Sequence, residues 1–403
     1  MRHRRHGREL PDRRRRFGLI LTDAATHELL IVGAGPAGAS AAMAARRAGL
    51  RVALIDKAAF PRNKLCGGGV TGRAMGHLHD VFGALPDELF LKVNRFRFVT
   101  GAVALCEFDD APDIWMTMRH SFDAVLRARA LEAGAEDFCG QRIASMAPRE
   151  GRITLVSGQT LQAPVVIAAD GVNSAVAHAM YGRAYDPARI GFALEAEIAG
   201  PPGVVTELDM TAAPWGYGWD FPKAGGRTLG LGGIAVRNAD MKLRFERWLA
   251  ARGIDPAGVK IKGHHLPFGE LRAHPGDGRV LFAGDAAGLV DPITGEGIAW
   301  AVRSGQLAAE AAALALTMDA PDRVAALYSA RMRHVQRELR RAGLLSKLVY
   351  HPRLQPRFMR ALSRSDHLQR RFLSLLAGEM DYADLGPARM MSLAWRILRG
   401  RSQ

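Results

Sequence analysis

The chain has little cysteine, and what it has suits neither a cross-link nor a metal site. Its 403 residues include three cysteines, Cys66, Cys106 and Cys139, and no two of them form a CxxC pair. A disulfide framework or a zinc site is therefore not indicated, and a reducing, cytoplasmic compartment fits. None of the 13 histidines has a metal-ligand spacing, so we predict no metal.

Long apolar runs are also missing. No stretch approaches the ~18 apolar residues that a membrane-spanning helix needs. The arginine-rich start resembles an export signal, but only GLIL follows before Thr22, which is too short for the usual ~7–15 apolar residues. We therefore predict a basic, disordered leader over 1–26. A membrane, if the protein contacts one, is contacted from its surface.

The net charge is close to zero in the middle of the chain and strongly positive at its two ends. Residues 1–16 carry +6 and residues 331–403 carry +11, whereas residues 17–330 carry −2 of the total of +15. A near-neutral body argues against a broad nucleic-acid surface, and no compact nucleic-acid module is recognisable. The basic ends favour contact with something anionic, such as phospholipid headgroups.

The first positive signal is a strand, glycine turn, helix and strand over residues 29–56. The apolar run LLIV leads into Gly33-x-Gly35-x-x-Gly38, an Ala-rich helix follows to about Ala48, and a second strand ends at Asp56. The three glycines permit a tight turn, close approach to a pyrophosphate, and close packing of helix on strand. Asp56 stands where an acid can accept hydrogen bonds from ribose hydroxyls. The pattern predicts a dinucleotide site but does not choose between NAD and FAD.

Two later segments repeat the logic of a buried strand followed by a turn. PVVIAADGVNS (164–174) ends a strand at Asp170, and RVLFAGDAAGLVDPITGEGI (279–298) ends one at Gly284 and Asp285. Ligands bind beyond the carboxyl ends of parallel strands. We expect Asp285 to bond a ribityl or ribose hydroxyl, and the backbone N–H groups over 295–298 to face a flavin pyrimidine.

These three ordered motifs resemble the FAD fingerprint of the flavoprotein hydroxylase and reductase superfamily, over residues 29 to about 310. The resemblance implies an α/β fold: a Rossmann-type FAD-binding domain, an inserted β-sheet substrate domain and a helical C-terminal region. It implies that the cofactor is FAD, held by Gly33, Gly35, Pro36, Ala37, Gly38, Asp56, Lys57, Cys66, Gly67, Arg119, Asp170, Gly284, Asp285, Pro292, Gly295, Gly297 and Ile298. No second nicotinamide-binding GxGxxG follows a strand, so the reductant, NADPH or another electron carrier, is expected to visit transiently.

The stretch WGYGWDFPKAGGRTLGLGG (215–233) selects a branch of this superfamily. Tyr217, Trp219 and Phe221 alternate, so on a strand they share one face. Such a row is most often sheet core, but aromatic walls also suit an elongated apolar ligand. The spacing Y-x-W-x-F-P then G-x-G, with Pro222 ending the strand and Gly232 beyond, resembles the pattern that lines the substrate pocket in geranylgeranyl reductases.

A cysteine before three glycines strengthens that resemblance. KLCGGGVTGR (64–73) is similar to the Cys-Gly-rich segment of the same family, although Leu65 stands where proline is usual. The resemblance implies that Cys66 lies near the reacting carbon, as a proton donor or by positioning substrate. The bare backbone at 67–69 permits close approach to the isoalloxazine or a phosphate. A flexible loop with an incidental thiol is the plain alternative.

Arg119 with Phe122 and Asp123 matches a further R-x-x-F-D pattern of the family. We expect Arg119 to contact FAD or shape its pocket. A helix-start residue paired with a local acid is an equally good reading.

The domain division follows from these motifs. We predict an FAD-binding domain over 27–105, 137–180 and 270–320, a substrate domain over 106–136 and 181–269, and a basic helical region over 321–403. In the last, arginine mixes with Leu, Met and Trp395 at helical spacing. This pattern predicts either a helical bundle that packs on the body or an amphipathic surface that binds anionic membranes.

The function predicted is an FAD-dependent reductase that saturates double bonds of a prenyl, geranylgeranyl-type substrate. One alternative is a flavin-dependent monooxygenase, whether hydroxylase, epoxidase or halogenase-like, acting on an apolar or aromatic substrate. A second is a non-catalytic or protein-modifying flavoprotein acting through its basic ends. The sequence leaves the oligomeric state open.

Overall fold

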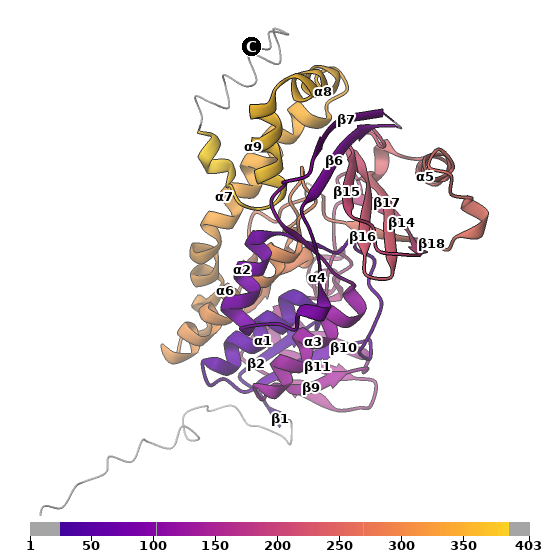
Figure 1. Cartoon of the computed structure of the whole chain (residues 1–403). Helices are drawn as coiled ribbons and strands as arrows, with labels where there is room; N and C mark the ends of the chain where they lie inside the picture. Colours follow the sequence, from indigo (N-terminus) through magenta and orange to yellow (C-terminus); the bar gives the residue numbers. More distant parts are fainter. Residues whose placement is uncertain (1–24, 102, 269, 387–403) are drawn as a thin grey trace, which may run out of the picture.

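The computed structural model describes residues 25–101, 103–268 and 270–386. Residues 1–24 of the predicted leader and the segment 387–400 with Trp395 lie outside this part of the chain. The last two residues of the predicted leader, Ala25 and Thr26, form strand β1 and are therefore not disordered. Two lobes with a helical C-terminal region are apparent in Figure 1. The mixed α/β architecture expected from the motifs is confirmed.

The first lobe is built on a six-stranded sheet. Neighbouring strands pair in parallel except at the antiparallel β19–β20 edge. β2 and β13 are buried along their whole length, as strands covered on both faces must be. Helix α1 contacts both α3 and α6. The strand order, with bounds, is β19 (Gly276–Asp277), β20 (Val280–Phe282), β13 (Val165–Ala168), β2 (Leu29–Val32), β3 (Val52–Asp56) and β9 (Glu136–Cys139).

The second lobe is a seven-stranded sheet whose central strands form long antiparallel pairs. Its order is β18 (Ile261–Leu266), β14 (Gly191–Ala199), β17 (Gly226–Ile234), β16 (Gly216–Lys223), β15 (Val205–Asp209), β6 (Arg95–Thr100) and β7 (Val103–Phe108).

Two smaller sheets complete the strands. One has the order β1 (Ala25–Thr26), β12 (Thr160–Gln162), β11 (Arg152–Leu155) and β10 (Ile143–Ala147). The other has the order β4 (Gly69–Val70), β8 (Ile114–Met116) and β5 (Leu91–Val93). The second of these joins the Cys66 segment to the strand before α3.

The helices of the body and the C-terminal region are α1 (Pro36–Arg47), α2 (Gly72–Phe82), α3 (Arg119–Glu132), α4 (Ala175–Tyr181), α5 (Met241–Ala250), α6 (Ile298–Thr317), α7 (Val324–Tyr350), α8 (Gln355–Arg364) and α9 (Asp366–Leu376). The long α7 packs along α6, and α8 and α9 lie beside β6 and β7 (Figure 1). The Phe372 ring of α9 lies 5.5 Å from the Phe98 ring of β6. The described part of 321–403 is thus packed on the body.

Strand pairing differs from the predicted domain bounds at two places. β6, assigned to the FAD-binding domain, pairs in parallel with β15 and so belongs to the seven-stranded sheet. α3, assigned to the substrate domain, packs on α1 of the first lobe. A parallel partner some 110 residues away leaves no local trace in sequence, which is why β6 was misplaced. The packing of α3 on α1 is a tertiary contact that leaves no local trace either.

One local expectation was also wrong. Pro222 does not end its strand, because β16 continues to Lys223. The glycines at 230, 232 and 233 lie within strand β17, after the hairpin turn. The β16–β17 hairpin keeps its register to its tip.

Candidate active site

A cavity of about 740 Å³ lies between the two lobes. Its lining draws on the turns after β2, β3, β13 and β20, on the Cys66 segment, and on the inner face of the seven-stranded sheet. This volume is in the range of ligand sites. Most of the predicted site residues line it; Gly38, Pro292 and Pro222 do not.

Gly33 and Gly38 allow the first turn to be built. Gly33 has φ +101°, and a Cβ there would lie 2.2 Å from the carbonyl oxygen of Ala169. A Cβ on Gly38 would lie 1.7 Å from the carbonyl oxygen of Gly33. Gly38 therefore does not line the cavity. Its missing side chain lets the start of α1 pack closely against the turn after β2.

The N-termini of α1 and α6 are both left without a side-chain cap. Gly35 caps α1 and Gly297 caps α6, with no side-chain hydrogen bond and no acid in either first turn. Unpaired N–H groups and the positive dipole end thus meet the cavity at both places, as an anionic ligand requires.

The acids that end the strands lie where the motifs predict. Asp56 is fixed by its Oδ2, which accepts from the Ala34 N–H at 2.9 Å. Asp170 accepts from the Val176 N–H at 3.2 Å, yet its buried Oδ1 has no hydrogen-bond partner among the described residues. Burial raises the pKa of Asp170. An unpaired buried acceptor, beside uncapped helix ends and side-chain-free turns, fits a dinucleotide cofactor such as FAD.

The turn at 291–297, expected beside the flavin pyrimidine, is held by an internal acid. Asp291 Oδ1 accepts from the N–H groups of Ile293 and Thr294 at 2.7 and 3.0 Å. It also accepts from the Tyr382 hydroxyl at 3.0 Å. Burial raises the pKa of Asp291, against these hydrogen bonds.

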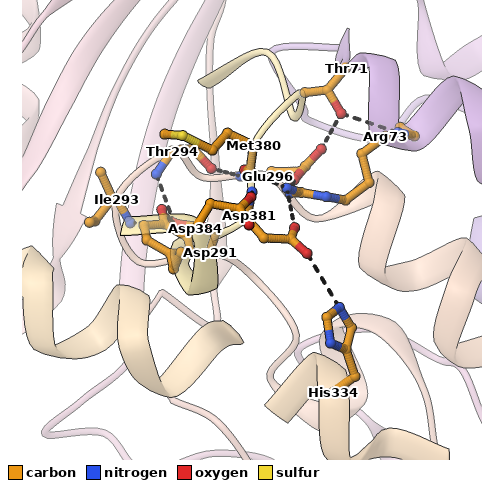
Figure 2. A network of polar contacts seen from close by, with 12 residues as sticks. Thr71, Arg73, Asp291, Ile293, Thr294, Glu296, His334, Met380, Asp381 and Asp384 are labelled. Atoms are coloured by element: carbon orange, nitrogen blue, oxygen red, sulfur yellow. Dashed lines mark hydrogen bonds and ion pairs between the residues drawn. The ribbon is translucent and has the colours of Figure 1, made fainter. Parts of the chain in front are cut away.

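A polar network ties this turn to the C-terminal region, as Figure 2 shows. Arg73 on α2 bonds Glu296 at 2.7 Å and Asp381 at 2.9 Å. The Thr71 hydroxyl also donates to Glu296, and His334 on α7 lies 3.5 Å from Asp381. Four separate parts of the chain thereby fix the same wall of the cavity.

The glycines after Cys66 have a reason that the sequence did not reveal. A Cβ on Gly67 would lie 3.0 Å from the Phe221 ring and 3.2 Å from Trp219 Nε1. Gly68 has φ +68°, and its Cβ would lie 2.1 Å from the Thr117 carbonyl oxygen. The segment needs bare backbone because it packs between β8 and the aromatic row. The predicted approach of these glycines to flavin or phosphate stays a prediction.

The aromatic row lies on the cavity face of β16, as its alternation predicts. Tyr217, Trp219 and Phe221 have ring centroids 5.9 and 6.4 Å apart in succession. The Tyr217 hydroxyl donates to the Thr294 carbonyl oxygen at 2.7 Å, and burial raises its pKa. Gly232 lines the cavity beside them. The row therefore reaches from the Cys66 segment to the 291–297 turn.

Arg119 combines both readings given for it. It lines the cavity, and it bonds the buried Asp123 through Nε at 2.6 Å and Nη2 at 2.8 Å. Arg62 lies 3.1 Å from the same carboxylate, and its buried Nη1 has no partner among the described residues.

Several lining residues were missed by sequence reasoning. Burial lowers the pKa of Lys64, although the negative charge of Asp285 opposes this shift. Burial also lowers the pKa of His264 to about 4, and the positive charge of Lys64 lowers it further. Lys64 begins the Cys-Gly-rich segment, so that motif could have pointed to it. His264 lies on a strand outside any motif, so no local signal could have found it. The apolar lining that was missed comes from other elements: Phe96, Ile114, Met116, Leu208, Leu266, Phe268 and Leu376.

The family is settled by comparison with known proteins. A family model described as FAD dependent oxidoreductase matches residues 28–181. The geranylgeranyl diphosphate reductase of Rhodobacter capsulatus is 31% identical over 71% of this chain and 75% of its own. The chain belongs to the geranylgeranyl reductase family of FAD-dependent oxidoreductases. It is therefore an enzyme, which removes the non-catalytic alternative.

Other relatives and structures place it more broadly. The menaquinone reductase of Mycolicibacterium smegmatis is 31% identical over 70% of this chain and 75% of its own. A geranylgeranyl bacteriochlorophyll reductase-like protein from Thermoplasma acidophilum has a TM-score of 0.65 at 21% identity, covering 87% and 91% of the two chains. A probable FAD-dependent monooxygenase from Pseudomonas aeruginosa has 0.63 at 19%, covering 82% and 99%. At these identities the solved structures establish only the fold.

Proposed function

We propose that this enzyme saturates carbon–carbon double bonds of a prenyl, geranylgeranyl-type substrate with electrons from FAD. The observation that carries the proposal is the continuity of the cavity. One volume joins the uncapped helix ends and acids of the first lobe to an apolar chamber against the second, and Cys66 lies in its lining.

The chamber suits a prenyl chain because its walls are apolar. Phe96, Met116 and Leu376 contribute side chains from β6, β8 and α9, and line the same cavity as the aromatic row. Removing an isoprenoid chain from water gains about 0.8 kcal/mol per buried CH₂. The names of the relatives agree, since both geranylgeranyl diphosphate and menaquinone carry prenyl chains.

The residues have distinct parts in this proposal. The turns at Gly33 and Gly284 and the N-terminus of α1 hold FAD, which supplies hydride equivalents when bound and reduced. NADPH or another carrier is the reductant. Tyr217, Trp219 and Phe221 orient the chain, and Cys66 gives the proton or positions the double bond. An isolated alkene is a poor electrophile, so proton donation must accompany hydride arrival.

The test is anaerobic turnover of the reduced enzyme. A panel of geranylgeranyl diphosphate, geranylgeranylated glycerophospholipid and menaquinone is incubated with chemically reduced enzyme, and products are analysed by mass spectrometry. We expect two added hydrogens per saturated bond without oxygen. Products that form only with oxygen, and that contain it, would establish the flavin monooxygenase instead.

The role of Cys66 is tested in the same system. With Cys66→Ala we expect single-turnover oxidation of the pre-reduced enzyme by a prenyl substrate to slow by about 10²-fold or more. An unchanged rate would remove the thiol from the chemistry.

We further propose peripheral contact with an anionic membrane through α7 and α8. In the part of the chain that the structure describes, Arg337, Arg340, Arg357, Arg360 and Arg364 are exposed and form no ion pair. Leu344 is 61% exposed and follows Arg337 and Arg340 on the same side of α7. Each such cation near an anionic leaflet contributes about 1 kcal/mol.

None of the helices among the described residues is long and apolar enough to cross a membrane. The membrane proposal is tested by sedimentation with liposomes. The protein should pellet with phosphatidylglycerol vesicles and not with phosphatidylcholine vesicles. A double variant, Arg357→Glu with Arg360→Glu, should lose the difference. Equal sedimentation with both vesicle types would overturn the contact.

A further inference from the structure

A buried carboxyl lies behind the aromatic row. Glu195 on β14 pairs with Gly230, which in turn pairs with Trp219. Directly paired residues point to the same face of a sheet, so Glu195 and Trp219 share the face that meets the cavity. A Cβ on Gly230 would lie 2.0 Å from the Trp219 ring, so the indole lies over the glycine, toward Glu195. Glu195 is only 3% exposed.

A buried ammonium lies under the Cys66 segment. Lys223, the last residue of β16, is 4% exposed and donates from Nζ to the carbonyl oxygens of Gly67 at 2.5 Å and Thr117 at 3.2 Å. The Cys66 Sγ lies on the same segment and accepts a hydrogen bond from the Gly68 N–H, with 3.4 Å between sulfur and nitrogen. A Cβ on Gly68 would lie 2.7 Å from the lysine Nζ. The ammonium therefore holds the piece of backbone that carries the thiol. Arg119 and Lys64 are the other cations that interact with Cys66.

Three buried polar atoms on this wall have no hydrogen-bond partner among the described residues. They are Glu195 Oε2, Trp219 Nε1 and Thr206 Oγ1. Thr206 lies two residues before the β15 residue that pairs with Trp219, so it shares their face. Leaving a buried polar group unpaired costs about 1–3 kcal/mol. Native proteins leave few such groups, and a catalytic role or a bound water is among the usual reasons.

The charges on this wall can change near neutral pH. Burial raises the pKa of Glu195 to about 7, and the negative charge of Glu197 adds to the rise. The positive charges of Lys223 and Lys262 and the hydrogen bond from the Cys66 N–H oppose it. Burial lowers the pKa of Lys223 to about 8, against Cys66, Glu195 and Glu197. Groups that transfer protons work best with pKa values near the operating pH.

We propose that Lys223 and Glu195 form a proton relay that returns a proton to the Cys66 thiol after it has donated one. The inference rests on the proposed function, in which the double bond receives a hydride equivalent and one proton. The C–H bond forms as the Cys66 S–H bond breaks. The Lys223 ammonium then protonates the thiolate and becomes an amine, the Glu195 carboxyl protonates the amine, and water restores the carboxyl. No electrons beyond the hydride pair are used.

The first test needs neither cofactor nor turnover. Cys66 is alkylated with iodoacetamide at neutral pH, and the modified peptides are quantified by mass spectrometry. Burial raises the pKa of Cys106 to about 11 and of Cys139 to about 12, so both should react slowly and serve as internal references. Lys223→Met should slow Cys66 alkylation at least about fivefold, because a nearby cation favours the reactive thiolate.

Lys262 supplies the matched control, because this lysine of β18 bonds the exposed Glu197 instead. Lys262→Met should leave the rate unchanged, and Lys223→Arg should restore it. If Lys223→Met merely loosened the loop, the thiol would become more exposed and Cys66 alkylation would speed up. That is the opposite of the slowing that we expect. A rate equal in Lys223→Met and wild type would overturn the relay.

The second test is the pH profile of alkene saturation over repeated turnovers, because the relay acts only after Cys66 has donated its first proton. In the wild type the rate should fall as pH rises through about 7, where Glu195 loses its proton. Glu195→Gln should abolish that inflection, and Glu197→Gln on the same strand should keep it. An inflection that persists in Glu195→Gln would overturn the relay. If the wild type saturates no alkene, the proposed function fails, whereas the alkylation result still decides whether Lys223 acts on Cys66.

Discussion

The two ends of the cavity are built in different ways. At the nucleotide end each wall is a short turn after a parallel strand, and its glycines and acids lie within a few residues of one another. At the apolar end the walls come from distant segments, such as Phe96 on β6, Trp219 on β16 and Leu376 on α9. A local motif can specify the first kind of wall. Only the completed tertiary structure specifies the second.

The largest expected effect breaks the nucleotide end alone. Gly38→Ala places a Cβ against the Gly33 carbonyl oxygen, at 1.7 Å if nothing moves, and backbone cannot give way cheaply. We expect the purified protein to lose nearly all bound FAD, measured by flavin absorbance per chain, and about 1–3 kcal/mol of unfolding free energy. Gly76→Ala, on α2 with open space around it, is the control. Full flavin content in Gly38→Ala would contradict the role assigned to this turn.

The next effect should break the apolar end and spare the other. Gly230→Ala pushes on the Trp219 ring, so we expect prenyl saturation to fall about tenfold or more, which is about 1.4 kcal/mol of transition-state stabilisation. Flavin content should stay at the wild-type level. Gly225→Ala, at the tip of the same hairpin, meets nothing within 4 Å and should behave as wild type. Equal loss of flavin and activity would mean that the two ends are not separable.

An effect on stability rather than on activity is expected where the two ends meet. Tyr382→Phe removes the hydroxyl that bonds Asp291 at 3.0 Å in the buried turn network. We expect a loss of about 1.5–3 kcal/mol in unfolding free energy, measured by urea titration, because the acceptor is a buried carboxylate. Tyr181→Phe removes a comparable bond to Asp277 at the surface and should cost less than about 0.5 kcal/mol. The prediction fails if the two variants are equally stable.

The last prediction concerns the pH response of the shared wall. The folded pKa of His264, about 4, lies below its usual 6.5 because the group is buried near Lys64. The unfolded chain therefore binds more protons in this range, and stability should fall as pH drops from 6.5 toward 4. His264→Gln should flatten that part of the unfolding free-energy curve, whereas His79→Gln, exposed on α2, should not. An unchanged slope in His264→Gln would place the titration elsewhere.

Sequence reasoning identified the nucleotide end well because its constraints are local. The strand, Gly33, α1 and Asp56 follow one another within 28 residues, and the structure has each element where the pattern puts it. The aromatic row was also accessible, since period-two alternation on one strand fixes its face. The family that these residues indicated was confirmed by the comparisons with known proteins.

The remaining features of the site depend on which strands pair with one another. No single segment of the sequence determines that pairing. Glu195 and Lys223 are ordinary residues of alternating strands until β14, β17 and β16 are placed side by side. The glycines at 67 and 68 looked like a flavin approach because the partners they pack on, Thr117 and Phe221, are 49 and 153 residues from Gly68. The misplacement of β6 and α3 has the same cause.

The link from Arg73 to Asp381 has a consequence for how the enzyme is made in the cell. The nucleotide motif emerges early from the ribosome, and domains can fold as they emerge. The wall at 291–297, however, takes hydrogen bonds from Tyr382, and Leu376 closes the chamber. A nascent chain halted before residue 376 thus has the cofactor turns but an open apolar chamber. The apolar lining of the chamber is therefore complete only after residue 376 has been synthesised.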